Sequence, residues 1–301
     1  MLPSEMLDSF RDHLDLEDDF ITKARTWERL FQAQQRIVRV IARLDPTYYM
    51  ESESISLVAN QALYSVPITM RLGARIVFIE NTQYPDTPQD VPPIAVKQRM
   101  NYTQGALQSL VPSFVFSWEG SKLRISPTPS SSSTGTIVAW HIPSLGNMLQ
   151  GTAAAGGSNT LTCFAGAPNW TSSWGEYDPR PDYYKHLTLY IYEGAGAGQE
   201  RKISASTSAR VFTVTEDWDT QPDTTSKFAV MCPVVEDYHE VVVLNACLTG
   251  SIKLRNRGRA LNQEYYGNPN SPGLYRQMVA DLAVRQESEH EVVEPADYNP
   301  Y

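Results

Sequence analysis

The chain has 301 residues, of which 42% are hydrophobic and 20% charged, so it is not a disordered chain and has the length of two or three folded domains. Its 25 basic and 34 acidic residues give a formal net charge of -9, and we therefore expect no non-specific affinity of the whole surface for nucleic acid. The three cysteines, Cys163, Cys232 and Cys247, include no CxxC pair, which argues against a disulfide scaffold or a structural zinc site.

Neither a targeting segment nor a membrane span is predicted. The opening residues, MLPSEMLDSF, lack the basic and then apolar layout of a signal peptide. The longest apolar run, VVVLNACL, is far shorter than the roughly 20 residues that cross a bilayer. We therefore expect a protein of the cell interior with no membrane partner.

The N-terminal part is predicted to be helical. Residues 4–14 have the apolar spacing of a short amphipathic helix. Asp15, with Asp18 three positions later, predicts the start of a longer helix that runs to Leu44 and ends because of Pro46.

This longer helix has two distinct faces. At 3.6 residues per turn its apolar residues fall on one side, and a basic stripe falls on the opposite side. The stripe consists of Arg25, Arg29, Arg36, Arg39 and Arg43. A second basic run contains Lys253, Arg255, Arg257 and Arg259, and we expect the chain to unwind or wrap there near Gly258. Each basic set is predicted to be a solvated face, a surface that meets an acidic neighbouring subunit, or a contact with DNA phosphates.

The middle of the chain is predicted to be rich in β-strands. Alternating patterns with frequent turn residues indicate strands within residues 62–67, 74–81, 114–129 and 134–143. Glu119, Gly120 and Ser121 are a candidate hairpin turn. The small-residue segment 146–160, GNMLQGTAAAGGSNT, is interpreted as a linker.

A second β-rich block follows, and helices return after it. Alternation indicates five strands between about Asn159 and Cys232. Helical spacing predicts one helix over residues 236–258 and another over residues 272–287. The last stretch, VVEPADYNPY, is polar and carries two prolines, so it is predicted to be an extended tail.

The order of these elements predicts an α+β fold. The N- and C-terminal helices are expected to form a helical bundle, with two β-rich, sandwich- or barrel-like blocks inserted between them. The predicted parts are a helical bundle with its C-terminal tail (1–49 and 233–301), a β-rich domain (50–147) and an inserted β-barrel-like domain (148–232).

The segment 194–203, GAGAGQERKI, has the glycine content of a phosphate-binding loop. A dinucleotide fingerprint needs a helix after the glycines, and a P-loop needs Gly-Lys followed by Ser or Thr. Here Gln199 and Glu200 follow, and then the alternating pattern of a strand. We therefore interpret the segment as a glycine-rich β-turn and predict no nucleotide cofactor.

No catalytic or metal-binding constellation is predicted. Asp217, Asp219, Gln221 and Asp223 alternate as in a calcium loop, but the later glycine and glutamate of that loop are missing. The five histidines form no HExxH motif, and no GxSxG serine is present. His239 beside Glu240 is interpreted as a pair on a helix surface. We expect no enzyme activity, cofactor or metal.

A carbohydrate-binding or tail-fibre-type β protein is the alternative prediction. Trp170, Trp174 and Trp218 lie in the second β block near several carboxylates. Exposed tryptophan rings are suitable stacking platforms for sugars. Cleavage of a glycosidic bond by paired carboxylates is a weaker form of the same idea.

The element order resembles that of a known family. The stretches RLDPTYY, QALYSVP, FSWEGSKLRISPTPS and GTIVAWHIPSL follow an N-terminal helix pair and precede a helix rich in Val, Leu and Ala. In this the chain resembles the head-to-tail adaptor, or connector, proteins of short-tailed bacteriophages. The resemblance covers roughly two-thirds of the chain, namely both helical ends and the first β block.

The second β block resembles a module found inserted in phage structural proteins. The pattern is GxGxGQ-x-R-x-I followed by W-x-x-x-PD-x-x-S. Its turn and core positions here are Gly194, Gly196, Gly198, Gln199, Arg201, Ile203, Trp218, Pro222, Asp223 and Ser226. The compact adaptors lack so large an insertion.

The resemblance implies a structural role in the virion neck, after assembly in the host cytoplasm. Such adaptors form a ring beneath the portal, which in these phages is dodecameric, and they present a surface to the tail nozzle protein and sometimes to tail fibres. DNA passes transiently through the lumen, and the acidic excess of this chain suits such passage. The implied portal and subunit docking residues are Glu294, Pro295, Tyr298, Pro300 and Tyr301.

Overall fold

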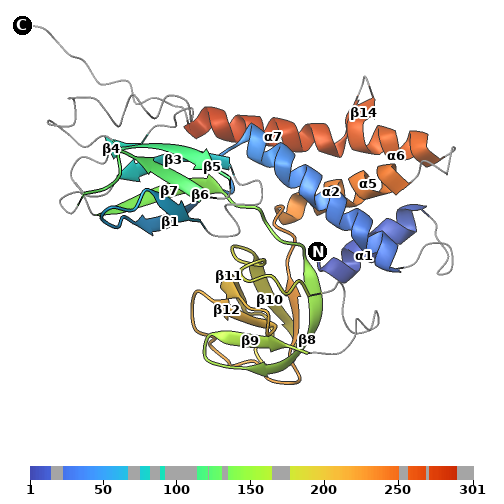
Figure 1. The fold of residues 1–301 in the computed structure, drawn as a ribbon. Coiled ribbons are helices and arrows are strands. Elements are labelled where there is room, and N and C mark those ends of the chain that lie inside the picture. The colour runs from blue at the N-terminus through green and yellow to red at the C-terminus, as the bar shows by residue number, and fades with distance from the viewer. Residues whose placement is uncertain are drawn as a thin grey trace, which may run out of the picture. The chain divides into compact units, whose positions relative to one another are not determined.

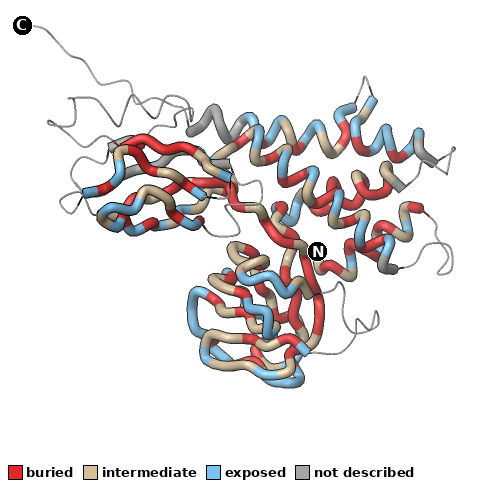
Figure 2. Tube along the Cα trace, in the orientation of Figure 1, coloured by how far each residue is buried: buried red, intermediate tan, exposed pale blue. Residues whose placement is uncertain are grey.

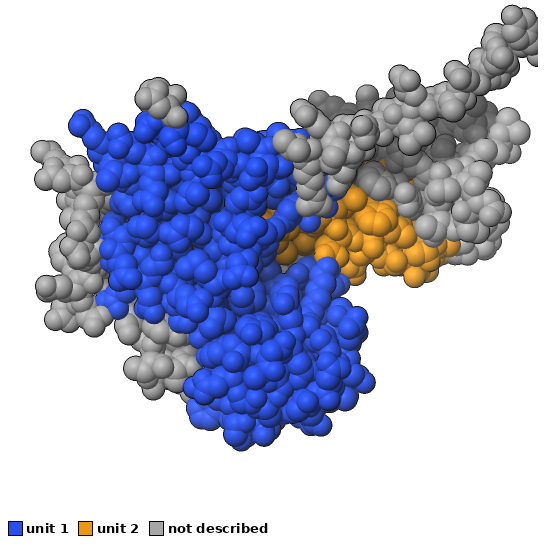
Figure 3. Space-filling view, turned by 180° about the vertical axis from the view of Figure 1, so that it is seen from behind, with its two compact units in different colours: residues 1–48, 146–180, 184–301 blue, residues 49–145, 181–183 orange. Residues whose placement is uncertain are grey.

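The computed structural model describes residues 1–14, 23–66, 75–81, 89–91, 114–120, 122–130, 135–164, 177–250, 257–268 and 271–289. In them, helices are combined with β-sheets, one of which closes into a six-stranded barrel (Figure 1), so the predicted mixture of α and β structure is confirmed. The chain divides into two compact units (Figure 3). Unit 1 contains residues 1–48, 146–180 and 184–301, and unit 2 contains residues 49–145 and 181–183.

Unit 1 contains the helices of both chain ends. They are α1 (Pro3–Leu14), α2 (Lys23–Leu44), α5 (His239–Gly250), α6 (Arg257–Tyr266) and α7 (Leu274–Glu289), with a short 3-10 turn, η3 (Glu236–Tyr238). Helix α5 packs against α1, α2, α6 and α7. It can do so because its residues are apolar all round, and Val241, Val242, Val243 and Leu244 are all buried (Figure 2). Among the described residues, no helix is both long enough and apolar enough to span a bilayer.

The C-terminal helices differ from the prediction. A single helix over residues 236–258 was expected, but residues 236–238 form η3, and α5 and α6 pack against each other as two separate helices. Gly258 itself lies in the first turn of α6, but residues 251–256 lie outside the described residues, so unwinding of the basic run just before that helix stays a prediction. A glycine costs a helix least near its end, where backbone groups have fewer helical partners.

The barrel also belongs to unit 1. Its strands are β8 (Leu149–Gly156), β9 (Thr160–Cys163), β10 (Thr188–Glu193), β11 (Glu200–Ser206), β12 (Val211–Val214) and β13 (Lys227–Val230). They pair in the closed antiparallel order β10-β11-β12-β9-β8-β13. Alternate side chains fill the interior, where Phe212 contacts Tyr184 at 5.3 Å and Phe228 at 5.8 Å between ring centroids.

The predicted linker over residues 146–160 is wrong, because most of this segment is strand β8. It pairs with β13 on one side and with β9 on the other, so it closes the barrel. Leu149 and Ala153 are buried in this strand. Alanine and glycine carry little hydrophobic signal in a sequence, yet their small size suits the inward-facing positions of a strand in a narrow barrel.

Polar contacts join the barrel to the N-terminal helix within unit 1. The backbone N–H of Ser4, in the first turn of α1, donates to Gln150 Oε1 at 2.9 Å. The Nε2 group of Gln150 donates in turn to the hydroxyl of Tyr192 at 3.0 Å. One side chain thus satisfies an unpaired amide at a helix start and ties β8 to β10.

Unit 2 consists of two antiparallel sheets that share one core. One sheet has the order β1-β7-β3-β4 and the other β2-β6-β5. The strands are β1 (Glu51–Ser56), β2 (Leu63–Ser65), β3 (Arg75–Asn81), β4 (Gln89–Asp90), β5 (Val115–Glu119), β6 (Lys122–Ser126) and β7 (Thr136–Ile142). Ile137 and Ile55 of the first sheet lie in the same buried cluster as Leu123 and Phe116 of the second. The predicted hairpin turn joins β5 to β6, where Gly120 has a φ of 61°.

Candidate interaction surface

The arginine stripe of α2, which consists of Arg25, Arg29, Arg36, Arg39 and Arg43, lies on the solvent side of the helix. Four of its members are exposed and Arg29 is partly exposed. Over this span a helix advances by about 27 Å, at 1.5 Å per residue. No ion pair joins any of the five to a carboxylate within the described part of the chain. The stripe is therefore an extended positive surface on a protein with a negative net charge.

The opposite side of α2 determines which way the stripe faces. Leu30, Ile37 and Ile41 are buried, and α2 packs on α5 through this side. Gln34, also buried, donates from Nε2 to the carbonyl oxygen of Gly146 at 2.9 Å. These contacts prevent the helix from turning its arginines inward.

The described residues of the second basic run lie on α6, not on α2 with the arginine stripe. Arg259 is exposed on α6, and Arg257 is the first residue of that helix. Lys253 and Arg255 lie outside the described residues, as do the tail residues Glu294, Pro295, Tyr298, Pro300 and Tyr301.

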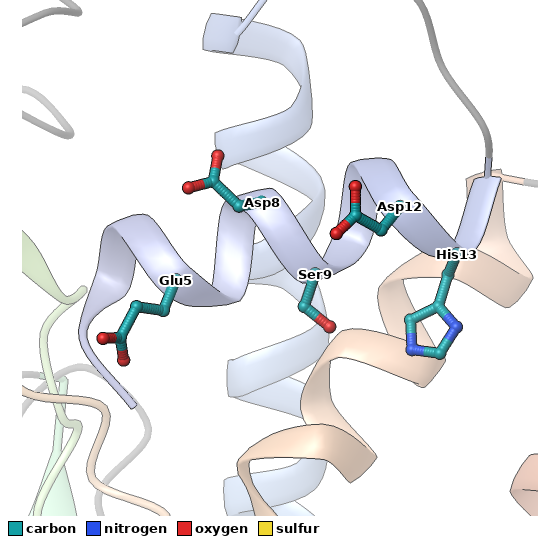
Figure 4. Close-up of a pocket in the computed structure, with 5 residues that line it drawn as sticks. All are labelled: Glu5, Asp8, Ser9, Asp12 and His13. Atoms are coloured by element: carbon teal, nitrogen blue, oxygen red, sulfur yellow. The ribbon is translucent and has the colours of Figure 1, made fainter.

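An acidic face on α1 was missed by the sequence analysis. Glu5, Asp8 and Asp12 are exposed at positions i, i+3 and i+7 of the helix, a spacing that places them on one side. Together with Ser9 and His13 they line an open hollow of about 500 Å³ (Figure 4). The signal was present in the sequence, because the same helical spacing that identified the basic stripe applies to these carboxylates.

Glu240 of α5 lies beside this face and connects the two helices. It is 2.5 Å from His13 Nε2, and the Ser9 hydroxyl donates to its carboxylate at 3.4 Å. Figure 4 shows Ser9 and His13 on the side of α1 that faces α5. The expected surface pair of His239 with Glu240 is wrong, since His239 is buried and its Nε2 lies 2.8 Å from the carbonyl oxygen of Val234. Burial also lowers the pKa of His239.

The glycine-rich segment forms the turn between β10 and β11. Gly194, Gly196 and Gly198 have φ values of 86°, 79° and 90°, a left-handed region that favours glycine. The turn binds its own amide groups: the N–H of Gly198 donates to the carbonyl of Ile191 at 2.8 Å, and that of Gln199 to the carbonyl of Gly196 at 3.2 Å. A strand follows, so the turn is not the start of a helix that could bind a phosphate.

The Gln199 side chain joins this turn to the segment after β12. Its Nε2 donates to the carbonyl oxygens of Gly196 at 3.1 Å and Thr220 at 2.9 Å. Its Oε1 accepts from the N–H groups of Asp219 at 2.7 Å and Thr220 at 3.3 Å. A single amide thus satisfies four backbone groups from two distant segments.

Pro222 and Asp223, the proline and the acid of the module, belong to the same junction. Asp223 Oδ1 accepts from the Thr225 hydroxyl at 2.6 Å and from the Thr225 N–H at 2.7 Å. These bonds lower the pKa of Asp223. Ser226 donates from its hydroxyl to the carbonyl of Ala195 at 2.7 Å, and Pro222 lies against the backbone of Gly156. These side chains therefore hold the loops of the barrel end together.

Some residues of the calcium and sugar hypotheses lie beside this junction. Asp219 pairs with Arg201 at 2.9 Å, and the described residues contain no group of three candidate metal ligands. Trp218 is only 6% exposed and lies beneath the Arg201 guanidinium, 5.9 Å from it. It is therefore not available as a stacking platform, and Trp170 and Trp174 lie outside the described residues.

The cysteines show no sign of nucleophilic chemistry. Cys163, Cys232 and Cys247 are all free and buried. Burial raises the pKa of each thiol, to about 12 for Cys232. A reactive cysteine needs the opposite, a lowered pKa with access to solvent.

No protein-family model matches this chain, and no curated protein sequence is similar to it.

Proposed function

We propose that this chain is a structural head-to-tail adaptor of a short-tailed bacteriophage, which forms a ring between the portal and the tail nozzle. The observation that carries the proposal is the arginine stripe of α2. It is exposed, rigidly oriented and unpaired among the described residues, which is what a contact surface for another subunit requires.

The helices of the two chain ends support this role. In the proposed arrangement they form one bundle, which carries the contacts with neighbouring copies and with the portal. Their mutual packing around α5 provides a rigid base for such contacts. Arginine is enriched at protein interfaces, where its planar guanidinium pairs with carboxylates in a defined geometry.

In this proposal the β-rich parts make the contacts with the other proteins of the tail. They contact the tail nozzle and, in some phages, tail fibres. The barrel end is held together by hydrogen bonds within the chain, as Gln199 and Ser226 illustrate. Polar groups that already have hydrogen-bond partners within the chain suit a rigid module that serves as a spacer or platform. An active site, in contrast, must leave polar groups free for a substrate.

Removal of residues 294–301 tests the proposed portal docking. We expect the truncated protein to remain folded, with unchanged circular dichroism, but to fail to join portal-bearing heads in a co-sedimentation assay. A variant in which the same eight positions are replaced by Gly and Ser controls for chain length, and should also fail. Normal attachment of either variant would contradict docking by this segment.

The position of the protein tests the function as a whole. A labelled copy in an image of the virion should lie in the neck, between head and tail. Virions that are complete and infectious without this protein would refute the adaptor role.

A further inference from the structure

We infer that the arginine stripe of α2 binds the acidic face of α1, formed by Glu5, Asp8 and Asp12, on a second copy of this chain. The inference rests on the proposed function only for the closure of the resulting assembly into a ring. The contact itself follows from charge, spacing and exposure.

The two surfaces have matching charge spacing. The carboxylates of the acidic face occupy positions i, i+3 and i+7 of α1. Arg36, Arg39 and Arg43 occupy positions i, i+3 and i+7 of α2. Two helices laid side by side in the same direction would therefore bring three arginines opposite three carboxylates, with about 10 Å between the first and the last pair.

Both surfaces are available to a partner. The carboxylates of Glu5, Asp8 and Asp12 are exposed, and they line an open hollow rather than a filled contact (Figure 4). The arginines are exposed too, and no described carboxylate of their own chain pairs with them.

The stripe also carries an internal cost that a partner would relieve. Arg25 with Arg29 and Arg39 with Arg43 are like charges four residues apart, which destabilise a helix. Opposite charges from a second molecule would offset this repulsion.

A second copy explains these features better than DNA does. The chain has a net charge of -9, so its overall field opposes the approach of a polyanion. The α1 face, in contrast, offers carboxylates with the required spacing, and every copy of the chain carries it. Each copy thus carries one basic stripe and one acidic face, so the two surfaces are present in equal numbers in any assembly of this protein.

The contact would use two different surfaces on each copy, so it would be heterologous. Such contacts join subunits head to tail and give a closed ring when the rotation between neighbours closes. Within the proposed function, this is the contact that builds the adaptor ring.

A charge exchange tests the inference with the full-length protein. The first variant carries Arg39→Glu and Arg43→Glu, the two arginines opposite Asp8 and Asp12, and the second carries Asp8→Lys and Asp12→Lys. For each variant alone, the self-association constant should fall at least about tenfold in sedimentation equilibrium at low salt, because its two surfaces now repel each other. A mixture of the two should regain association, because every surface of one variant is then complementary to a surface of the other.

Matched controls separate this contact from a general effect of charge. Arg276→Glu with Lys122→Glu changes the net charge as the first variant does, at exposed sites that belong to neither α1 nor α2. Glu216→Lys with Asp217→Lys does the same for the second variant. Both controls should associate as the unaltered protein does.

A disulfide trap provides an independent measurement. Asp8→Cys and Arg39→Cys proteins, mixed under mild oxidation, should form a cross-linked heterodimer, whereas the buried native thiols stay unreactive. Circular dichroism of each variant establishes that it is folded.

Three outcomes would overturn the inference: an unaltered chain that stays monomeric at low salt, variants whose association is unchanged, or a mixture that fails to recover. Loss of binding to a DNA duplex in the first variant, with self-association intact, would assign the stripe to DNA instead. Restored association together with virions that are complete without the protein would leave the contact standing and refute only the adaptor role.

Discussion

Replacement of Gly194 by alanine should destabilise the barrel by two separable effects. Gly194 has a φ of 86°, which costs a non-glycine residue about 1–2 kcal/mol. In addition, an added Cβ would lie 2.2 Å from the carbonyl oxygen of Thr225, so the backbone of one loop would have to move. Overpacking of this kind costs about 1–3 kcal/mol, and the total is about 2–5 kcal/mol.

Gly198 offers a matched control within the same turn. Its φ is 90°, but a Cβ added there would meet nothing within 4 Å. Gly198→Ala should therefore destabilise the barrel only by the cost of a positive φ in a non-glycine residue, about 1–2 kcal/mol. The difference between the two variants isolates the close approach of the loop that contains Thr225.

Hydrogen exchange measured by mass spectrometry can make this comparison in the full-length protein. Peptides from β10 to β13 report on the opening of the barrel, while peptides from unit 2 serve as an internal reference. Since about 1.4 kcal/mol corresponds to a tenfold change, barrel amides of Gly194→Ala should exchange roughly 5 to 150 times faster than those of Gly198→Ala. Equal exchange in the two variants would refute the steric argument.

Three further predictions concern the same module. Gln199→Glu keeps the acceptor for the Asp219 and Thr220 amides but loses both donated bonds, so it should destabilise the barrel by about 1–3 kcal/mol, measured by hydrogen exchange. Phe212→Ala removes a fully buried ring and should cost about 3–5 kcal/mol in denaturant unfolding, whereas a loss below 1 kcal/mol would contradict its place in the core. Burial raises the pKa of Cys232 to about 12, so its contribution to stability should be complete below the unfolded pKa of about 8.5 and fall as pH rises towards 12. A thiol reagent at pH 8 should accordingly label it only after unfolding.

The sequence alone was sufficient where a single element determines the answer. The apolar spacing of α2 predicted which side its arginines take, because the buried side of a helix fixes its rotation. Gln199 and the alternation after it likewise indicated a turn between strands instead of a nucleotide loop. In both cases the signal lies within a few residues of the feature that it predicts.

Only the tertiary structure decided the features that depend on partners far apart in the sequence. Strand β8 was mistaken for a linker because alanine and glycine become strand residues only when β9 and β13 pair with them. Trp218 looked like an exposed platform until Arg201 and the barrel core covered it. Local periodicity sets the orientation of one element, whereas burial and pairing depend on which other elements the fold brings against it.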